Sequence, residues 1–71
     1  MTDLSRLRKR SVLIAGHRTS VSLEDAFWDV LKEIADRRGS SLNQVVMEVD
    51  EKRTGNLSSA LRVYALTSRG R

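Results

Sequence analysis

The fold of this chain is decided by one stretch, His17-Arg18-Thr19-Ser20-Val21-Ser22-Leu23-Glu24-Asp25. Apolar and polar side chains alternate in its first part, so Thr19, Val21 and Leu23 share one face of an extended strand. The opposite face then carries Arg18, Ser20 and Ser22. From Leu23 onward, the apolar spacing changes to that of a helix. The stretch therefore predicts a strand over about residues 18–23 that runs directly into an amphipathic helix.

Such a strand needs a neighbour, because its backbone N–H and C=O groups must form hydrogen bonds. No clear second strand follows it in the sequence. We therefore expect the same strand of a second copy to pair with it, antiparallel, across a two-fold axis. In the alternative, residues 12–15 form a strand and Gly16-His17 form a hairpin turn, so that the chain pairs with itself. We favour the first arrangement, because a glycine at the start of a turn is a weak signal.

The first predicted helix covers about residues 24–38. We expect Ser22 as its N-cap, acidic side chains in its first turn, and a left-handed stop at Gly39. Trp28 lies at the edge of the apolar stripe, where we expect it to pack across a subunit boundary rather than to stack on a base. The stripe that should face the core consists of Leu23, Phe27, Val30, Leu31 and Ile34.

Two further helices are predicted, over about residues 41–53 and 57–67. Ser40 or Ser41 is the expected N-cap of the first of these, and Asn56 caps the second. Valines dominate the apolar stripe of the first, so burial must supply its stability. The expected core positions are Leu42, Val45, Val46, Val49, Leu57, Ala60, Leu61 and Tyr64, with Val63 and Leu66 broadening the apolar face of the last helix.

Length and charge limit the class of protein. The 71 residues suffice for one small domain, which we place at residues 11–71 after a flexible basic arm at residues 1–10. Thirteen Lys and Arg against nine Asp and Glu give a net charge of +4 and a pI near 10.4. The excess precedes the first predicted helix, which favours a polyanionic partner. There is no cysteine, and the longest apolar run is far too short to span a membrane. We expect a cytoplasmic protein that does not contact membranes.

The sequence offers no catalytic site. His17 is the only histidine, and nothing places a carboxylate or an oxyanion hole beside it. Glu24 and Asp25 are consecutive, so they diverge around a helix and act as first-turn partners of its dipole. The four glycines are scattered, which excludes a glycine-rich phosphate loop. No group of metal ligands is visible. We therefore expect neither an enzyme nor a bound metal or cofactor.

The polar strand face fits a binding role better. An arginine can donate two hydrogen bonds to a guanine edge, and a serine can meet several base edges. Because a two-stranded ribbon fits the major groove of DNA, we expect Arg18, Ser20 and Ser22 to contact bases. Ser40 and Ser41 begin a helix whose free N–H groups suit a phosphate. The other expected phosphate contacts are Arg8, Lys9, Arg10 and His17.

The order of these features resembles the ribbon-helix-helix family of Arc- and MetJ-like bacterial DNA-binding proteins. The resemblance covers about residues 18–53, through the alternating strand, the helix, the Gly39 stop and the serine-capped second helix. Residues 8–20 and 55–62 also resemble a small uncharacterised bacterial subgroup of such domains.

The resemblance implies a mainly α fold with one short β-strand, assembled as an intertwined homodimer. Its two-stranded intermolecular ribbon would enter the major groove, with Arg18, Ser20 and Ser22 at the outward positions and Ser41 at a phosphate. The segment before the strand and the helix at residues 57–67 are additions to the simplest pattern.

These features favour a sequence-specific DNA-binding protein that regulates transcription. The alternative is a dimeric protein-interaction module of the same fold, for example an antitoxin-like protein, with little or no DNA readout. In that alternative, the helix at residues 57–67 would dock a protein partner.

Overall fold

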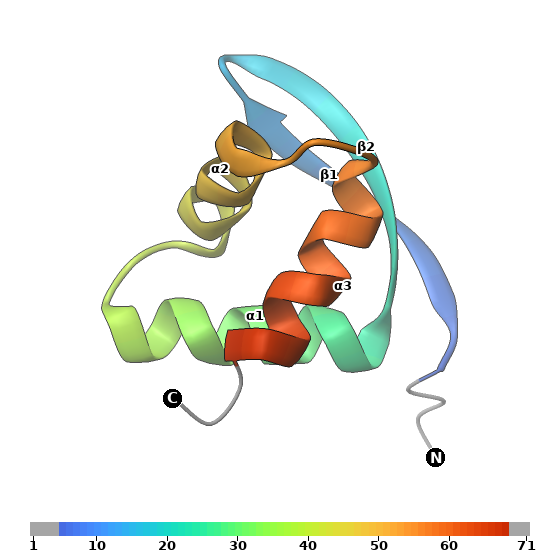
Figure 1. The fold of residues 1–71 in the computed structure, drawn as a ribbon, viewed down its shortest axis with the longest axis vertical. Helices are drawn as coiled ribbons and strands as arrows, with labels where there is room; N and C mark the ends of the chain where they lie inside the picture. Colours follow the sequence, from blue (N-terminus) through green and yellow to red (C-terminus); the bar gives the residue numbers. More distant parts are fainter. Residues whose placement is uncertain (1–4, 69–71) are drawn as a thin grey trace.

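A computed structural model describes residues 5–68 of the chain. A β-hairpin comes first and three helices follow it, with the curved hairpin lying along one side of the helices (Figure 1). The elements are β1 (Leu7–Ile14), β2 (His17–Glu24), α1 (Asp25–Arg38), α2 (Leu42–Lys52) and α3 (Leu57–Ser68). None of the described helices is both long and apolar enough to cross a membrane.

The neighbour of β2 is β1 of the same chain. The two strands are antiparallel, with Ile14 opposite His17 next to the turn. Ala15 and Gly16 form the two-residue loop, with φ of 51° and 82°. Positive φ at both positions is typical of a type I′ turn, whose twist matches that of paired strands. This corrects the prediction that a second copy supplies the neighbouring strand, and it moves the turn one residue before the alternative Gly16-His17 placement.

β1 also corrects the predicted limit of the basic arm. Residues 7–10 form the first half of β1, while residues 1–4 of the predicted arm lie outside the described residues. The sequence signal was weak here because Arg8 and Arg10 occupy positions on the core-facing side of the strand. Charged side chains at such positions hide the apolar alternation by which a half-buried strand is found.

The helix ends follow the capping signals with one exception. The predicted left-handed stop at Gly39 is confirmed by its φ of 68°. The hydroxyl of Ser41 accepts a hydrogen bond from the Gln44 N–H at 3.1 Å and so caps α2 as predicted. The prediction of Ser22 as the N-cap of α1 is wrong, because Ser22 lies within β2 and α1 begins only at Asp25.

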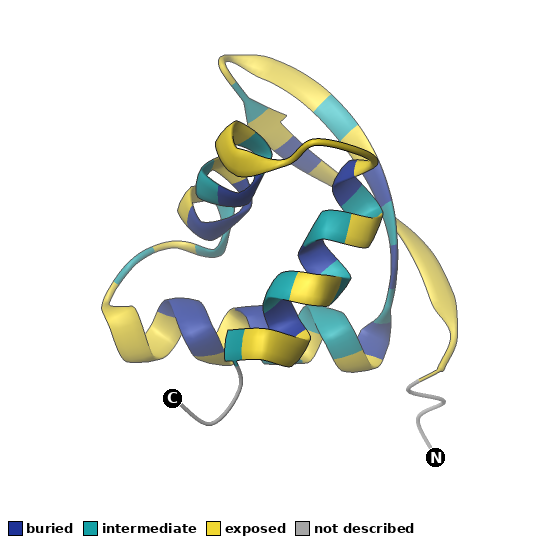
Figure 2. Cartoon of the chain, in the orientation of Figure 1, coloured by how far each residue is buried: buried dark blue, intermediate teal, exposed yellow. Residues whose placement is uncertain are grey.

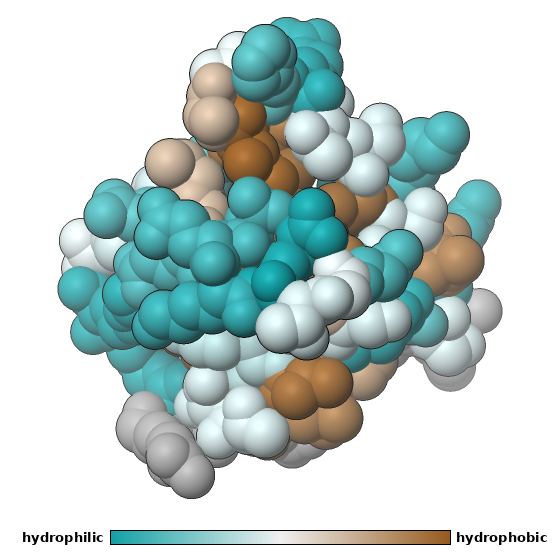
Figure 3. Space-filling view, turned by 45° about the horizontal axis from the view of Figure 1, so that its top comes forward, coloured by the Kyte–Doolittle hydropathy of each residue, from teal (hydrophilic) through white to brown (hydrophobic). Residues whose placement is uncertain are grey.

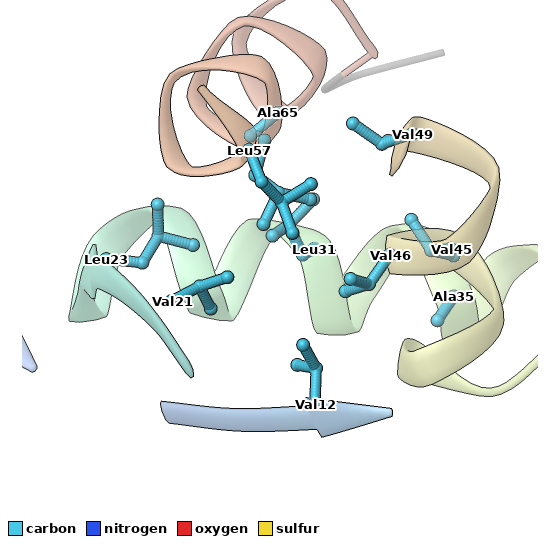
Figure 4. Packing of buried hydrophobic residues seen from close by; sticks show 11 residues of the cluster. Val12, Val21, Leu23, Leu31, Ala35, Val45, Val46, Val49, Leu57 and Ala65 are labelled. Carbon is cyan, nitrogen blue, oxygen red and sulfur yellow. The ribbon is translucent and has the colours of Figure 1, made fainter. Parts of the chain in front are cut away.

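The core lies where the hairpin and all three helices meet (Figures 2 and 4). Leu23, Leu31 and Leu61 are fully buried there, and burial of each such side chain is worth about 1.5–3 kcal/mol. α3 is therefore part of the core. Val63 and Leu66 were expected to broaden its buried face, but they are 60% and 55% exposed. The buried cluster consists of Val12, Val21, Leu23, Leu31, Ala35, Val45, Val46, Val49, Leu57, Leu61 and Ala65.

Candidate nucleic-acid interface

The hairpin turns one face toward the core and the other away from it. The face turned away carries side chains of both strands, because residues opposite each other in an antiparallel pair point to the same side. Five of its six central residues are exposed, and only Ser22 is half-buried. We name these six residues the outer face. It consists of three cross-strand pairs, Leu13 with Arg18, Ser11 with Ser20, and Lys9 with Ser22.

The outer-face pair nearest the turn, Leu13 with Arg18, is held by α2. The Leu13 N–H donates to the Asn43 side-chain oxygen at 2.8 Å, and the Asn43 amide nitrogen donates to the Leu13 carbonyl at 2.8 Å. These backbone groups thus point away from β2, which makes Leu13 and Arg18 a non-hydrogen-bonded pair. Side chains approach most closely in pairs of this kind. Leu13 and Arg18 therefore stand side by side on the outer face.

Side chains of the helices also occupy the open edges of the hairpin. Asn43 bonds the edge of β1 at Leu13, as a third strand would. On the edge of β2, the Ser22 N–H donates to the Ser58 hydroxyl of α3 at 3.3 Å. A strand from a second copy would have to break these bonds to pair along either edge. The described ribbon is therefore two-stranded and made by one chain.

Arg8 and Arg10, two of the expected phosphate contacts, pair with a carboxylate of the chain itself. Arg8 and Arg10 lie on the inner side of β1, and both pair with Asp25, which is only 7% exposed. The Arg8 Nε lies 3.2 Å from the carboxylate. The guanidinium of Arg10 also lies 4.6 Å from the ring centroid of Trp28, a cation–π contact. Asp25 thus ties β1 to the start of α1, beyond its predicted role at the helix dipole, and Trp28 packs within its own chain.

The other expected phosphate contacts are spread over the turn, the outer face and the start of α2. His17 and Ser41 are exposed, and Lys9 belongs to the outer face. The Ser40 hydroxyl is buried without a hydrogen-bond partner in the described structure. Because Asn43 joins the first turn of α2 to Leu13, the exposed Ser41 lies at a helix end that adjoins the hairpin.

Glu24, at the base of the hairpin, forms an ion pair with Arg62 of α3. Glu24 accepts a hydrogen bond from the Arg62 Nε at 2.8 Å. This bond holds the pKa of the Glu24 carboxyl below its ordinary value of 4.5. The carboxylate of Glu48 on α2 similarly raises the pKa of Arg38 at the end of α1. Since Glu24 is paired and the outer face carries no acidic residue, the charges of Lys9 and Arg18 are not offset on that face.

Two members of the outer face were not predicted. Ser11 and Leu13 belong to β1, which the preferred interpretation of the sequence did not treat as a strand of the ribbon. The signal was present in the alternation of Lys9, Ser11 and Leu13 with the inward Val12 and Ile14. Arg18, Ser20 and Ser22 lie on the face predicted for them, although their contacts with bases stay a prediction.

The helices form a groove away from the outer face. A groove of about 520 Å³ lies between the end of α2 and α3. Its apolar lining includes Val49, Ala60, Val63 and Tyr64. Among residues 5–68, no group of three His, Cys, Asp or Glu side chains could hold a metal ion. Figure 3 shows one side of the molecule, where hydrophilic surface dominates and apolar side chains appear as separate patches.

Comparisons with known proteins agree with this architecture. Residues 7–68 match the ribbon-helix-helix domain family. The solved structure of an uncharacterized protein from Bordetella pertussis Tohama I is similar, with 36% sequence identity and a TM-score of 0.76. The similarity covers 89% of this chain and 55% of that one, so the chain spans about half the length of that protein. A comparison with curated proteins gave no match.

Proposed function

We propose that this chain, which belongs to the ribbon-helix-helix family, binds DNA by placing the outer face of its hairpin in the major groove. The family is a non-enzymatic DNA-binding and regulatory fold. The observation that carries the proposal is the outer face itself, which presents two cations and three hydroxyls away from the core. A bacterial protein with this activity would regulate transcription and act in the cytoplasm.

The dimensions of the hairpin support this placement. Paired strands lie about 4.8 Å apart, and the major groove is about 12 Å wide. A two-stranded ribbon with its side chains therefore fits the groove. The described helices reach the edges of the hairpin through Asn43 and Ser58, which leaves the outer face open toward the groove floor.

The proposed contacts divide into two groups. Arg18, Ser20 and Ser22 contact base edges, as the sequence predicts, and Ser11 joins them from β1. Ser41 and the amides at the start of α2 approach a phosphate beside the groove, because positive N–H groups at a helix start attract anions. His17 and Lys9 add phosphate contacts near each end of the outer face. Arg10 is held by Asp25 and Trp28, and the proposal does not depend on it.

Selection from a random duplex library with the full chain tests the proposal, followed by fluorescence anisotropy on the selected duplex. Arg18→Ala should weaken binding by about 1–3 kcal/mol and relax the preference at one base pair. Lys32→Ala is the matched control, because it removes one exposed charge from α1. Equal losses in both variants, or no selected sequence, would contradict readout by the outer face.

We also propose that two copies associate through their helices. Ribbon-helix-helix proteins typically form dimers, but here the hairpin is already complete within one chain. The groove between α2 and α3, with the exposed Val63 in its lining, gives a second copy an apolar surface to cover. Burial of such surface is the main driving force of association.

Solution mass measured over a range of concentrations tests this dimer. Val63→Asp should lower the mass toward that of one chain, and Ala26→Asp, at an exposed position of α1, should leave it unchanged. A wild-type monomer at every concentration would contradict the dimer. A different protein that co-purifies through this groove, with no DNA bound, would instead favour the alternative function, an antitoxin-like interaction module.

A further inference from the structure

The one apolar side chain of the outer face stands beside its arginine. Leu13 is 51% exposed and lies directly opposite Arg18 in the hairpin. An exposed leucine at this position adds nothing to the core. Its backbone, in contrast, is held firmly by the two hydrogen bonds to Asn43. The chain thus presents a rigidly placed apolar group at the tip of the proposed DNA-binding face.

We propose that Leu13 and Arg18 act together, with Leu13 contacting the methyl group of a thymine and Arg18 the edge of a neighbouring guanine. This inference rests on the proposed function and names the bases that the hairpin tip selects. In the major groove, thymine is marked by its C5-methyl group and guanine by two acceptors, N7 and O6. A leucine complements the first and an arginine the second.

The spacing of the pair suits two adjacent base pairs. Residues in a non-hydrogen-bonded cross-strand pair have Cα atoms about 4.5 Å apart. Successive bases along a DNA strand are about 3.4 Å apart. Two side chains that start side by side can therefore reach two neighbouring base pairs without a movement of either strand. Because Leu13 comes from β1 and Arg18 from β2, both contacts come from a single chain.

The test uses the selected duplex with each thymine replaced in turn by deoxyuridine, which removes only the methyl group. At one thymine, this replacement should weaken binding of the wild-type chain about fourfold, the effect of one buried methylene-sized group. Leu13→Ala should bind the two duplexes equally at that position. Arg18→Ala should keep the preference for thymine while it loses the preference for the neighbouring guanine. Leu13→Met should keep the fourfold effect, because it retains an apolar side chain of similar volume.

Circular dichroism and thermal unfolding establish that each variant is folded. Sensitivity to the methyl group at one thymine, lost only in Leu13→Ala, would support the inference. If no replacement weakens wild-type binding, or if Leu13→Ala keeps the fourfold effect, the inference is overturned. A chain that selects a sequence and needs Arg18, yet is insensitive to the methyl groups, overturns this inference alone. A chain that binds no DNA overturns the proposed function as well.

Discussion

Asp25 shows how one residue changes the role of two others. Arg8 and Arg10 form part of the basic N-terminal excess that points to a polyanion, yet both turn toward this nearly buried carboxylate. A buried carboxylate is tolerated only when it is paired and hydrogen-bonded. The arginines satisfy that need and, in doing so, attach the first half of β1 to α1. Net charge therefore overstates the number of cations that face a partner.

Replacement of this carboxylate should be costly. Asp25→Asn leaves Arg10 partly buried without its charged partner, and we expect the free energy of unfolding to fall by about 1–3 kcal/mol. Urea denaturation followed by circular dichroism measures the change. Asp29→Asn is the control, since its pair with Lys32 is more than half exposed and such pairs contribute about 0–1 kcal/mol. Similar losses in the two variants would show that Asp25 has no special role.

Glu24 gives the hairpin base a dependence on pH. Its hydrogen bond with Arg62 lowers the pKa of the Glu24 carboxyl in the folded chain. A group with a lowered folded pKa stabilises the fold above its unfolded pKa, and this stabilisation is lost as the pH falls through the folded pKa. We expect Glu24→Gln to be less stable than wild type at pH 7, and the difference to shrink once the pH falls below 4.5 and to vanish below the lowered folded pKa. Denaturation curves at several pH values measure it, with Glu51→Gln on α2 as the control. A difference that persists at low pH would argue against the ion pair.

At the scale of elements, the hairpin depends on its neighbours as much as on its own strands. An isolated two-stranded hairpin is only marginally stable in water. Here Asn43 of α2 and Ser58 of α3 satisfy backbone groups on its two edges, and the core covers its inner face. The helices thus hold the hairpin in place, while its outer face stays free.

Loss of the edge contact should loosen the hairpin tip. Asn43→Ala leaves the Leu13 N–H and carbonyl without their partner, and we expect a loss of about 1–2 kcal/mol in the free energy of unfolding. Hydrogen exchange of the Leu13 amide should also accelerate. Gln44→Ala, at an exposed position of the same helix, should change neither quantity. Unaltered exchange at Leu13 in the Asn43 variant would contradict this account.

At the scale of the whole molecule, α3 completes the core of a very small domain. Chains of this length bury only about 60% of the surface that their unfolded state exposes, so each buried layer counts. α3 contributes Leu57, Leu61 and Ala65. In this structure, one chain therefore surrounds its core with its own elements.

Truncation within that layer should remove much of the total stability. Leu61→Ala creates a cavity at a fully buried position and is expected to cost about 2–5 kcal/mol, against a typical total of about 5–15 kcal/mol. Thermal unfolding should show a large drop in midpoint. Met47→Ala, at a side chain 38% exposed, should have a small effect. A Leu61 variant as stable as the Met47 variant would mean that α3 is not part of the cooperative core.

The sequence by itself determined the features that depend on local spacing. The alternation in residues 18–23 predicted β2, the stops and caps at Gly39, Ser41 and Asn56 predicted the helix ends, and the valines of α2 predicted its buried face. Each of these signals acts within a few residues, where side-chain period and backbone hydrogen bonding decide the conformation. The outward position of Arg18 follows from the same period.

The tertiary structure alone decided what pairs with what. The neighbour of β2, the carboxylate that holds Arg8 and Arg10, and the exposure of Val63 on α3 all depend on residues distant in the sequence. The period of apolar residues in the sequence shows which side chains share a face, but it does not show which element covers that face. An edge strand pairs with any strand that lies close enough to it. The turn at Ala15 and Gly16 places β1 of the same chain beside β2, so β2 does not require a strand from a second copy.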